Sequence, residues 1–416
     1  MQNDNIAEVR GVGTSQNLDP QINQSTVVTS KMKEFGSKGD KFLKQDHDMK
    51  LLTQIETKQN SKIQLTKEEI FFLYEVTMKI DGFGYKKDPR IEKIKSERDL
   101  KSDIILAYDN KYSRDEITTT LEEFNLGKSK IHFGDLDLYN LTTASGLKLP
   151  EIMSGDLNLS GLTNASGLKL PETLNGELDL GSLTNASGLK LPEILNGSLF
   201  LSSLTNASEL KLPETINGSL ILTSLTNASG LKLPETLNGS LFLGSLTTAS
   251  GLKLPEILNG ELDLGGLTNA SGLKLPEIMS GNLDLGSLTN ASGLKLPETL
   301  NGDLDLRGLT TISGLKLPDT INGELDLRGL KTAHGLKFPD TINGDLNLSG
   351  LTTASGLKLP ETINGDLYFG SLTTAPGLKL PDTINGTLYL DSLKTAKDLK
   401  LPKGVGHYSG PQDIQR

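Results

Sequence analysis

The stretch Gly-Leu-Lys-Leu-Pro-Glu-Thr-Leu-Asn-Gly-Glu-Leu-Asp-Leu-Gly-Ser-Leu-Thr-Asn-Ala-Ser occupies residues 167–187 and recurs down roughly two thirds of the chain. Its proline falls every 21 residues from Pro150 to Pro402, which gives thirteen copies without an insertion. A fixed period of this size is typical of solenoids, in which each repeat forms one coil stacked on the previous one. The sequence therefore predicts a solenoid array.

Two parts of the unit alternate between apolar and polar residues, as a half-buried strand does. One is Gly176–Leu180, and the other is Gly188–Pro192, where the lysine points outward and the proline ends the strand because it has no N–H group. Asn175-Gly176 indicates a turn in which the glycine takes positive φ. We therefore predict a mainly β fold, a parallel β-solenoid of thirteen coils of 21 residues.

Each coil has seven apolar positions that we expect to point inward. In one coil they are Leu174, Leu178, Leu180, Leu183, Ala186, Leu189 and Leu191. The spacing Leu-x-Leu-x-x-Leu resembles leucine-rich repeats and the coils of receptor L domains. The asparagine ladder of leucine-rich repeats is replaced by leucine, as at Leu183, Leu204 and Leu225. This resemblance implies a leucine-rich-like cross-section without the helices of a standard horseshoe.

The chain also resembles uncharacterised repeat proteins predicted from ultra-small uncultured bacteria. The resemblance lies in Phe72–Glu75, in Gly82–Ile91 and in the Gly-Leu-Lys-Leu-Pro-Glu unit, and it spans about 350 residues. It implies no function.

We divide the chain into four regions. Residues 1–44 are polar with no apolar period and are expected to be a disordered tail. Residues 45–130 are expected to form a small α-helical N-terminal cap, residues 131–402 the solenoid, and residues 403–416 a C-terminal tail. Helix starts are predicted by three patterns, and Gly127 is expected to end the last helix. The patterns are Thr66 with Glu69, Asp88 before Pro89, and Ser113 with Glu116.

Composition narrows the class of partner. The formal net charge is −10, and all of it lies in residues 131–416, which hold 20 Lys/Arg and 30 Asp/Glu against 22 and 22 in residues 1–130. An acidic rod repels phosphate backbones, so we expect no nucleic-acid partner. Without cysteine there are no disulfides or thiolate metal sites, and no apolar run is long enough for a membrane span.

Residues 1–30 lack the apolar core of a secretory signal. We therefore expect a cytoplasmic protein, with secretion by a route that needs no signal as the alternative. We also expect the protein to be a monomer.

The outward position between the two leucines of the first strand varies in blocks rather than at random. Acids and asparagines give way to Phe200, Ile221 and Phe242 in three adjacent coils, and later to Tyr368 and Tyr389. The position two residues earlier changes at the same point to Ser198, Ser219 and Ser240. An apolar column with a polar rim is the usual form of a contact site. We predict that these eight residues bind a protein partner.

Other functions stay open at this point. The runner-up is a passive structural spacer. The acidic columns suggest calcium through oxygen ligands, although the aspartate nonapeptide of calcium-binding rolls is absent. The threonine column from Thr142 to Thr373 suggests ice binding, although the companion position is Ala or Ile. The lysine of each Leu-Lys-Leu is expected to pair with the acid three residues later.

We expect no enzyme, no catalytic residues, no cofactor and no metal site. The four histidines lie at unrelated places, and no nucleophile motif or phosphate-binding loop is present. An unrecognised activity in the helical segment is the remaining alternative.

Overall fold

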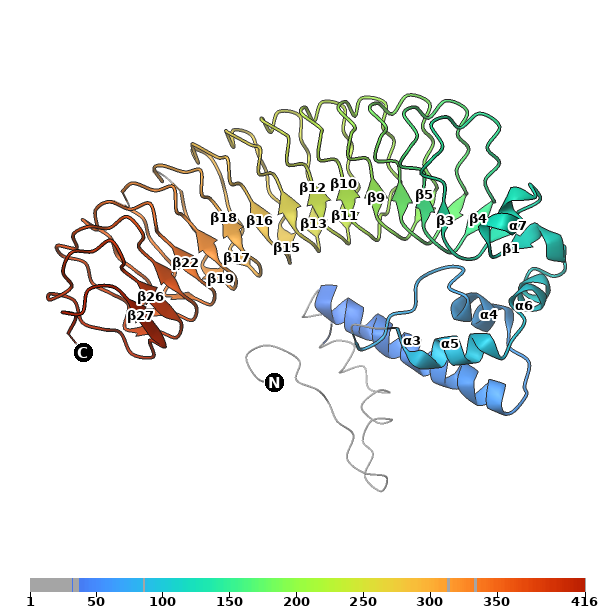
Figure 1. The fold of residues 1–416 in the computed structure, drawn as a ribbon, viewed down its shortest axis with the longest axis horizontal. Coiled ribbons are helices and arrows are strands. Elements are labelled where there is room, and N and C mark those ends of the chain that lie inside the picture. Colours follow the sequence, from blue (N-terminus) through green and yellow to red (C-terminus); the bar gives the residue numbers. More distant parts are fainter. Residues whose placement is uncertain (1–31, 33–36, 85–86, 313–314, 333–334, 416) are drawn as a thin grey trace, which may run out of the picture. The chain divides into compact units, whose positions relative to one another are not determined.

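The computed structural model describes residues 32, 37–84, 87–312, 315–332 and 335–415. It is a parallel β-solenoid of about thirteen coils with a few helices at the N-terminus, which confirms the predicted fold class (Figure 1). The chain forms two compact units, Met1–Arg114 and Asp115–Arg416. The predicted boundary at residue 130 therefore lies too late, because residues 115–130 belong with the coils.

The first unit contains the helices α3 (Ser37–Asn60), α4 (Lys67–Leu73), α5 (Pro89–Ser96) and α6 (Leu100–Ala107). Thr66 and Glu69 form the predicted capping box of α4, and Asp88 caps α5 by accepting from the N–H of Arg90. Helix α3 begins inside the segment expected to be a disordered tail. The rest of that tail, residues 1–31 and 33–36, lies outside the described residues.

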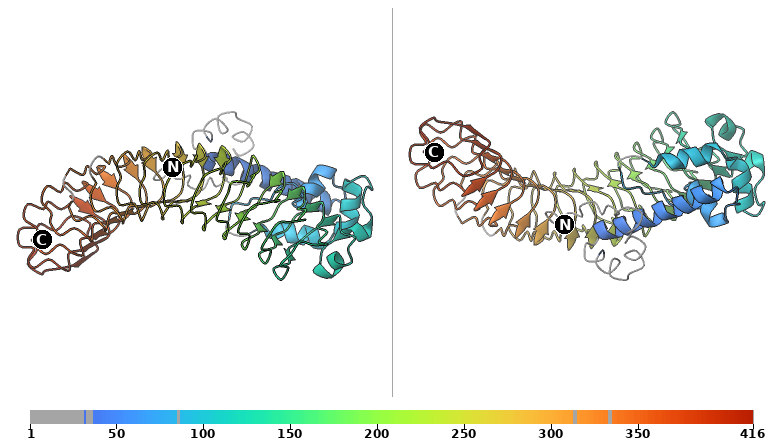
Figure 2. Two further views of the ribbon diagram at one scale, coloured as in Figure 1. Left: turned by 90° about the horizontal axis from the view of Figure 1, so that it is seen from above. Right: turned by 90° about the horizontal axis from the view of Figure 1, so that it is seen from below.

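In the second unit one strand of each coil joins a single parallel sheet of 14 strands, which we call the long sheet. Its strands all run along one long edge of the stack, and the coils follow one another in single file (Figures 1 and 2). They are β3 (Leu136–Asp137), β5 (Leu157–Asn158), β7 (Leu178–Asp179), β9 (Leu199–Phe200), β10 (Leu220–Ile221), β12 (Leu241–Phe242), β14 (Leu262–Asp263), β16 (Leu283–Asp284), β18 (Leu304–Asp305), β20 (Leu325–Asp326), β22 (Leu346–Asn347), β24 (Leu367–Tyr368), β26 (Thr387–Tyr389) and β27 (His407–Ser409).

A second strand in most coils follows the proline and builds three shorter parallel sheets. Their strands are β1 (Ile117–Thr118), β2 (Ile131–His132), β4 (Ile152–Met153), β6 (Thr173–Leu174) and β8 (Ile194–Leu195), then β11 (Thr236–Leu237), β13 (Ile257–Leu258) and β15 (Ile278–Met279), then β17 (Thr299–Leu300), β19 (Thr320–Ile321), β21 (Thr341–Ile342), β23 (Thr362–Ile363) and β25 (Thr383–Ile384).

The position of this second strand corrects one prediction. Residues 188–192 alternate as predicted, with Leu189 buried and Lys190 exposed, but they form no strand. The ladder instead starts after Pro192, at Ile194.

Between the sheet that ends with β8 and the sheet that starts with β11, the second strand is reduced to one residue, Ile216, which forms an isolated bridge to Leu195 on one side and to Leu237 on the other. In the same coil Glu209 replaces a glycine that takes positive φ in neighbouring coils, for example 76° at Gly188 and 83° at Gly230. Glu209 itself does not take positive φ, which is costly for a residue with a Cβ. The altered turn thus coincides with the interrupted strand.

The glycine of Asn-Gly has a different role from the predicted one. Gly176 does not take positive φ. A Cβ on Gly176 would lie 2.1 Å from the carbonyl oxygen of Gly155 in the previous coil. The glycine is therefore required by the close approach of successive coils.

The asparagine of Asn-Gly forms side-chain ladders that the sequence analysis did not foresee. The Nδ2 of Asn196 donates to Oδ1 of Asn175 at 2.6 Å, and the series continues to Asn259. A second ladder runs from Asn301 to Asn385. Ser280 takes the asparagine position between them, and the buried Oδ1 of Asn259 has no partner.

One continuous apolar core fills the coils and agrees with the predicted inward positions. Leu174, Leu178, Leu180 and Leu183 are fully buried, and the residue at the seventh position, Leu191, packs against the core while partly exposed. Side chains with few methyl groups suit the narrow space between two layers of backbone.

Both ends of the array are covered by its own unit. At the start, β1 pairs with β2, and the following helix α7 (Leu121–Asn125) places Phe124 in the core. Helix α7 is capped by Thr120 rather than by the predicted Ser113, and Gly127 ends it at a φ of 74°. The 3-10 turn η1 (Arg114–Glu116) follows the predicted cap residue Ser113 directly.

At the other end the segment predicted to be a tail continues the stack. Strand β27 pairs with β26, and Ile414 is buried in the core. The carboxylate of Asp413 accepts from the N–H of Ala396 at 2.8 Å. An apolar cap and a final strand thus cover the last coil, whose open edge would otherwise invite stacking.

Candidate functional site

The outward face of the long sheet carries the predicted contact residues. Numbering coils by the first strand, with Asp137 in coil 1, the apolar column of Phe200, Ile221 and Phe242 lies in coils 4 to 6. The column is in strict register on β9, β10 and β12, which lie side by side (Figure 1). Each of the three side chains is half-buried.

The residues on either side of the column in each strand point inward. Leu220 and Leu222 flank Ile221 and are both fully buried. The predicted assignment of the two faces of this strand is therefore confirmed.

The predicted serine rim has a structural role. The Oγ of Ser198 accepts from the N–H of Ser219 at 3.1 Å, Ser219 accepts from Ser240 at 3.0 Å, and Ser240 accepts from Glu261 at 3.0 Å. In other coils Asp or Asn makes the same bond, as when Asp156 accepts from Glu177. These serines satisfy backbone N–H groups between coils.

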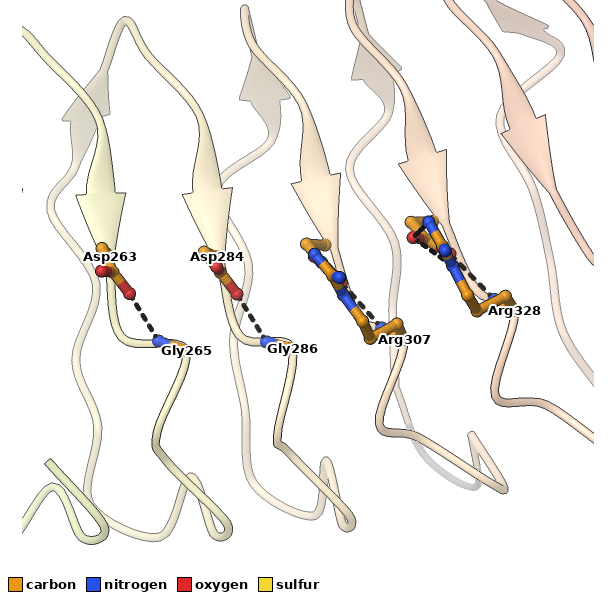
Figure 3. A network of polar contacts seen from close by, with 8 residues as sticks. Asp263, Gly265, Asp284, Gly286, Arg307 and Arg328 are labelled. Atoms are coloured by element: carbon orange, nitrogen blue, oxygen red, sulfur yellow. Dashed lines mark hydrogen bonds and ion pairs between the residues drawn. The ribbon is translucent and has the colours of Figure 1, made fainter. Parts of the chain in front are cut away.

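In coils 2, 3 and 7 to 11, the acid or amide at the column position closes a turn. Asp263 accepts from the N–H of Gly265 at 2.9 Å, and Asp284 accepts from the N–H of Gly286 at 2.7 Å (Figure 3). Asn158 does the same with the N–H of Ser160. This bond is a side-chain turn of the kind that Asp and Asn favour. Phe200, Ile221 and Phe242 have no acceptor with which to make it.

The replacement of Asp or Asn by Phe or Ile at the column position removes a stabilising hydrogen bond. One such hydrogen bond contributes about 0.5–1.5 kcal/mol. Three successive coils therefore give up a local stabilising contact in order to present apolar side chains. Departures from a local rule of folding concentrate at functional sites.

The apolar column is bordered by carboxylates on both sides. Coils 1 to 3 and 7 to 8 contribute acids at the two outward positions, and no Lys or Arg occupies the outward face of the long sheet in coils 1 to 8. The acids are Asp135, Asp137, Asp156, Glu177, Asp179, Glu261, Asp263 and Asp284.

These carboxylates crowd one another in the described structure. Burial raises the pKa of Asp284, and the neighbouring charges of Asp305 and Asp263 raise it further. Burial and the same kind of repulsion also raise the pKa of Glu261. At the border of the apolar column, the ionised forms of Glu261 and Asp284 are therefore destabilised by burial and by neighbouring negative charges.

In coils 9 and 10, arginines pair with the acids at the column position, whereas the acids two residues earlier on the same face, Asp303 and Glu324, form no ion pair in the described structure. The guanidinium of Arg307 pairs with Asp305, and that of Arg328 pairs with the buried Asp326 (Figure 3). The Nε atoms lie 2.6 Å from Asp305 Oδ2 and 2.7 Å from Asp326 Oδ2. At the column position, the unpaired acids Asp179, Asp263 and Asp284 therefore lie closer to the apolar column than the two paired acids do.

Tyr368 and Tyr389 form a separate patch in coils 12 and 13. Their rings stack with centroids 4.6 Å apart and an interplanar angle of 5°. The hydroxyl of Tyr368 donates to Asp366 at 2.9 Å. Six coils separate Tyr368 from Phe242, a distance of about 29 Å at the usual spacing between strands. The structure does not bring the two aromatic groups together.

The remaining candidates have structural roles where the structure describes them. Asn185 of an Asn-Ala-Ser triplet closes a turn by accepting from the N–H of Ser187, and Thr205 donates to the carbonyl of Thr184 in the previous coil. Lys316 pairs with Asp319 at 3.2 Å, whereas the equivalent Lys190 and Glu193 form no ion pair. The predicted lysine–acid ladder is therefore not general.

Among the described residues, no group of three or more His, Asp or Glu side chains is arranged to hold a metal ion, and no helix is both long and apolar enough to cross a membrane. Comparisons with known protein families, with curated proteins and with solved structures found no match.

Proposed function

We propose that this chain is a non-enzymatic recognition or scaffold protein, and that the apolar column of the long sheet is where it contacts another protein. The observation that carries the proposal is the coordinated change in coils 4 to 6, where Phe200, Ile221 and Phe242 replace residues that would otherwise close a turn. The change removes from each coil a hydrogen bond that Asp or Asn makes in neighbouring coils.

Clusters of half-exposed aromatic and branched side chains supply much of the free energy of protein association. A rigid sheet also presents them without loss of conformational entropy on binding. The Phe–Ile–Phe column has both properties, since its backbone is held by ladder hydrogen bonds on both sides.

The triple variant Phe200→Asn, Ile221→Asn and Phe242→Asn tests the proposal. Asparagine closes the turn at this position in coil 2, so the fold should be retained. We expect wild-type protein to capture a specific partner from lysate of the native host and the triple variant to lose it, with an unchanged circular dichroism spectrum. Equal capture by the folded variant would contradict the proposal.

The alternative function, a passive spacer, gives a different result. A spacer would recover no specific protein with either version of the chain. The Tyr368→Asn and Tyr389→Asn double variant is a matched control, because it removes two aromatic side chains from the same sheet outside the apolar column. It should leave capture intact.

A further inference from the structure

The surroundings of the apolar column indicate what kind of segment it binds. Asp179 precedes the column in coil 3, and Asp263 follows it in coil 7, both in register with it. Each carboxylate accepts a backbone hydrogen bond, but neither forms an ion pair in the described structure, unlike Asp305 and Asp326 farther along. The column is therefore an apolar strip with a free negative charge at each end.

We infer that the occupant is an extended protein segment with apolar side chains in the middle and a Lys or Arg at each end. This inference rests on the proposed function and names the class of partner for the same surface. Opposite charges at an interface select the partner and raise the rate of association, while apolar burial supplies affinity.

The spacing sets the length of the segment. Four steps between strands separate Asp179 from Asp263, which is about 19 Å at 4.8 Å a step. An extended chain advances about 3.3 Å a residue, so about six steps, from the first to the seventh residue of a segment, span that distance. Side chains that face the sheet recur every second residue. The matching pattern is a base, two alternate apolar residues and a second base, as in Lys-Ser-Leu-Ser-Leu-Ser-Lys.

The charge distribution disfavours two other occupants. Nucleic acid would bring phosphates against carboxylates. A second copy of this face, related by a two-fold axis through Ile221, would set the acids of coils 1 to 3 and 7 to 8 against the same acids of its partner. A basic segment instead relieves the crowding that raises the pKa of Glu261 and Asp284.

Binding of three terminally blocked peptides to the full-length protein tests the inference. The first is Lys-Ser-Leu-Ser-Leu-Ser-Lys, the second has Glu for both lysines, and the third has Ser for both leucines. We expect the first to bind at least tenfold more tightly than either of the others and to lose affinity as salt is added. Equal binding of the Glu peptide, or no binding of any peptide, would overturn the inference.

Two variants separate this inference from the proposed function. Asp179→Asn with Asp263→Asn keeps both turn acceptors and removes the charges, so it should weaken the Lys peptide several-fold and flatten its salt dependence. The triple Asn variant of the apolar column should abolish binding. If the Glu peptide binds as well as the Lys peptide and the triple variant abolishes both, the apolar contact stands and the charge rule fails. If the triple variant binds normally, the site itself is wrong.

Discussion

The carboxylate of Asp284 has two opposing effects on the stability of the fold, and replacing it by an amide would keep one and remove the other. Its Oδ1 closes the turn to Gly286, which stabilises the coil, while its charge lies between Asp263 and Asp305. Because burial and these neighbours raise its pKa in the folded state, the ionised form is less stable there than in the unfolded chain. The ionised carboxylate of Asp284 therefore destabilises the fold at neutral pH, and this destabilisation disappears as the pH falls and the carboxyl is protonated.

We therefore predict that Asp284→Asn stabilises the fold at neutral pH, by about 0.5–1 kcal/mol at low salt. Most of the gain should vanish at about 1 M salt, where the Debye length is about 3 Å. Asp284→Ala removes the turn acceptor as well and should gain less. Urea denaturation of the three proteins measures the effect. A loss of stability in Asp284→Asn would show that repulsion is unimportant here.

His132 gives the opposite pH dependence. Its side chain is completely buried beside Thr118, with Nδ1 2.8 Å from the hydroxyl, and burial lowers its pKa below the ordinary 6.5. The folded state therefore favours the neutral imidazole, so stability is complete above 6.5 and falls as the pH drops through the lowered folded value.

His132→Gln keeps a polar side chain without a titrating group. We predict that the melting temperature of the wild type falls between about pH 7.5 and about pH 5 more steeply than that of His132→Gln. Parallel curves for the two proteins would show that the histidine does not contribute to the pH dependence of folding.

Among single residues, the inward and outward assignments were predictable because large apolar residues alternate along the first strand of every coil, as at Leu220 and Leu222, with Phe369 in place of leucine in coil 12. The turn closed by Asp or Asn was not foreseen. Its signal was present, because the column position holds either Asp or Asn in eight of the thirteen coils and these two residues share only an acceptor oxygen. The serine rim was assigned to a partner for a similar reason: a hydroxyl that bonds to the next coil cannot be told from a free one in a sequence.

At the scale of one strand, the two faces should differ sharply in energy. Leu222 is fully buried and Ile221 is half-buried on the other face. Leu222→Ala should destabilise the fold by about 2–5 kcal/mol, because it leaves a cavity in a narrow core. Ile221→Ala should cost far less. Chemical denaturation compares them, and equal losses would mean that the outward column supports the fold rather than a partner.

The asparagine ladders give a second test at this scale. Ser280 interrupts two ladders and leaves the buried Oδ1 of Asn259 without a partner. Ser280→Asn should let one amide bond to Asn259 and to Asn301, and so raise the free energy of unfolding by about 1 kcal/mol. Ser280→Ala is the control that adds no amide and should not stabilise. No gain in Ser280→Asn would show that the ladders do not contribute to stability.

The second strand and the ladders mark the limit of prediction for elements. Alternation in residues 188–192 matched a strand, but backbone pairing starts after the proline, and a pattern of side chains does not reveal which N–H groups pair. The asparagine of Asn-Gly was interpreted as a turn residue because a ladder exists only between coils, which no single repeat displays.

For the whole molecule, the 21-residue period was sufficient to predict the stack of coils. A helix that caps the first coil was also predicted, and α7 places Phe124 in the core there. Residues 403–415 contain none of the repeat pattern, so their packing onto the last coil could not be anticipated. The negative charge of the array was predictable, since it follows from the positions of Lys, Arg, Asp and Glu in the sequence. The pairing of Arg307 with Asp305 and of Arg328 with Asp326 was predictable as well, because each arginine lies two residues after its acid.

Contact between the apolar column and another protein is the property on which the proposed function depends. A photo-crosslinking phenylalanine derivative at position 221, compared with the same group at the exposed Lys232 of the adjoining loop, tests it most directly in the native host. We expect the probe at position 221 to form a discrete adduct with a second protein. This adduct should be lost when Phe200→Asn and Phe242→Asn are added, and the probe at position 232 should form none. Equal adducts from both positions, or an adduct from 232 alone, would contradict it.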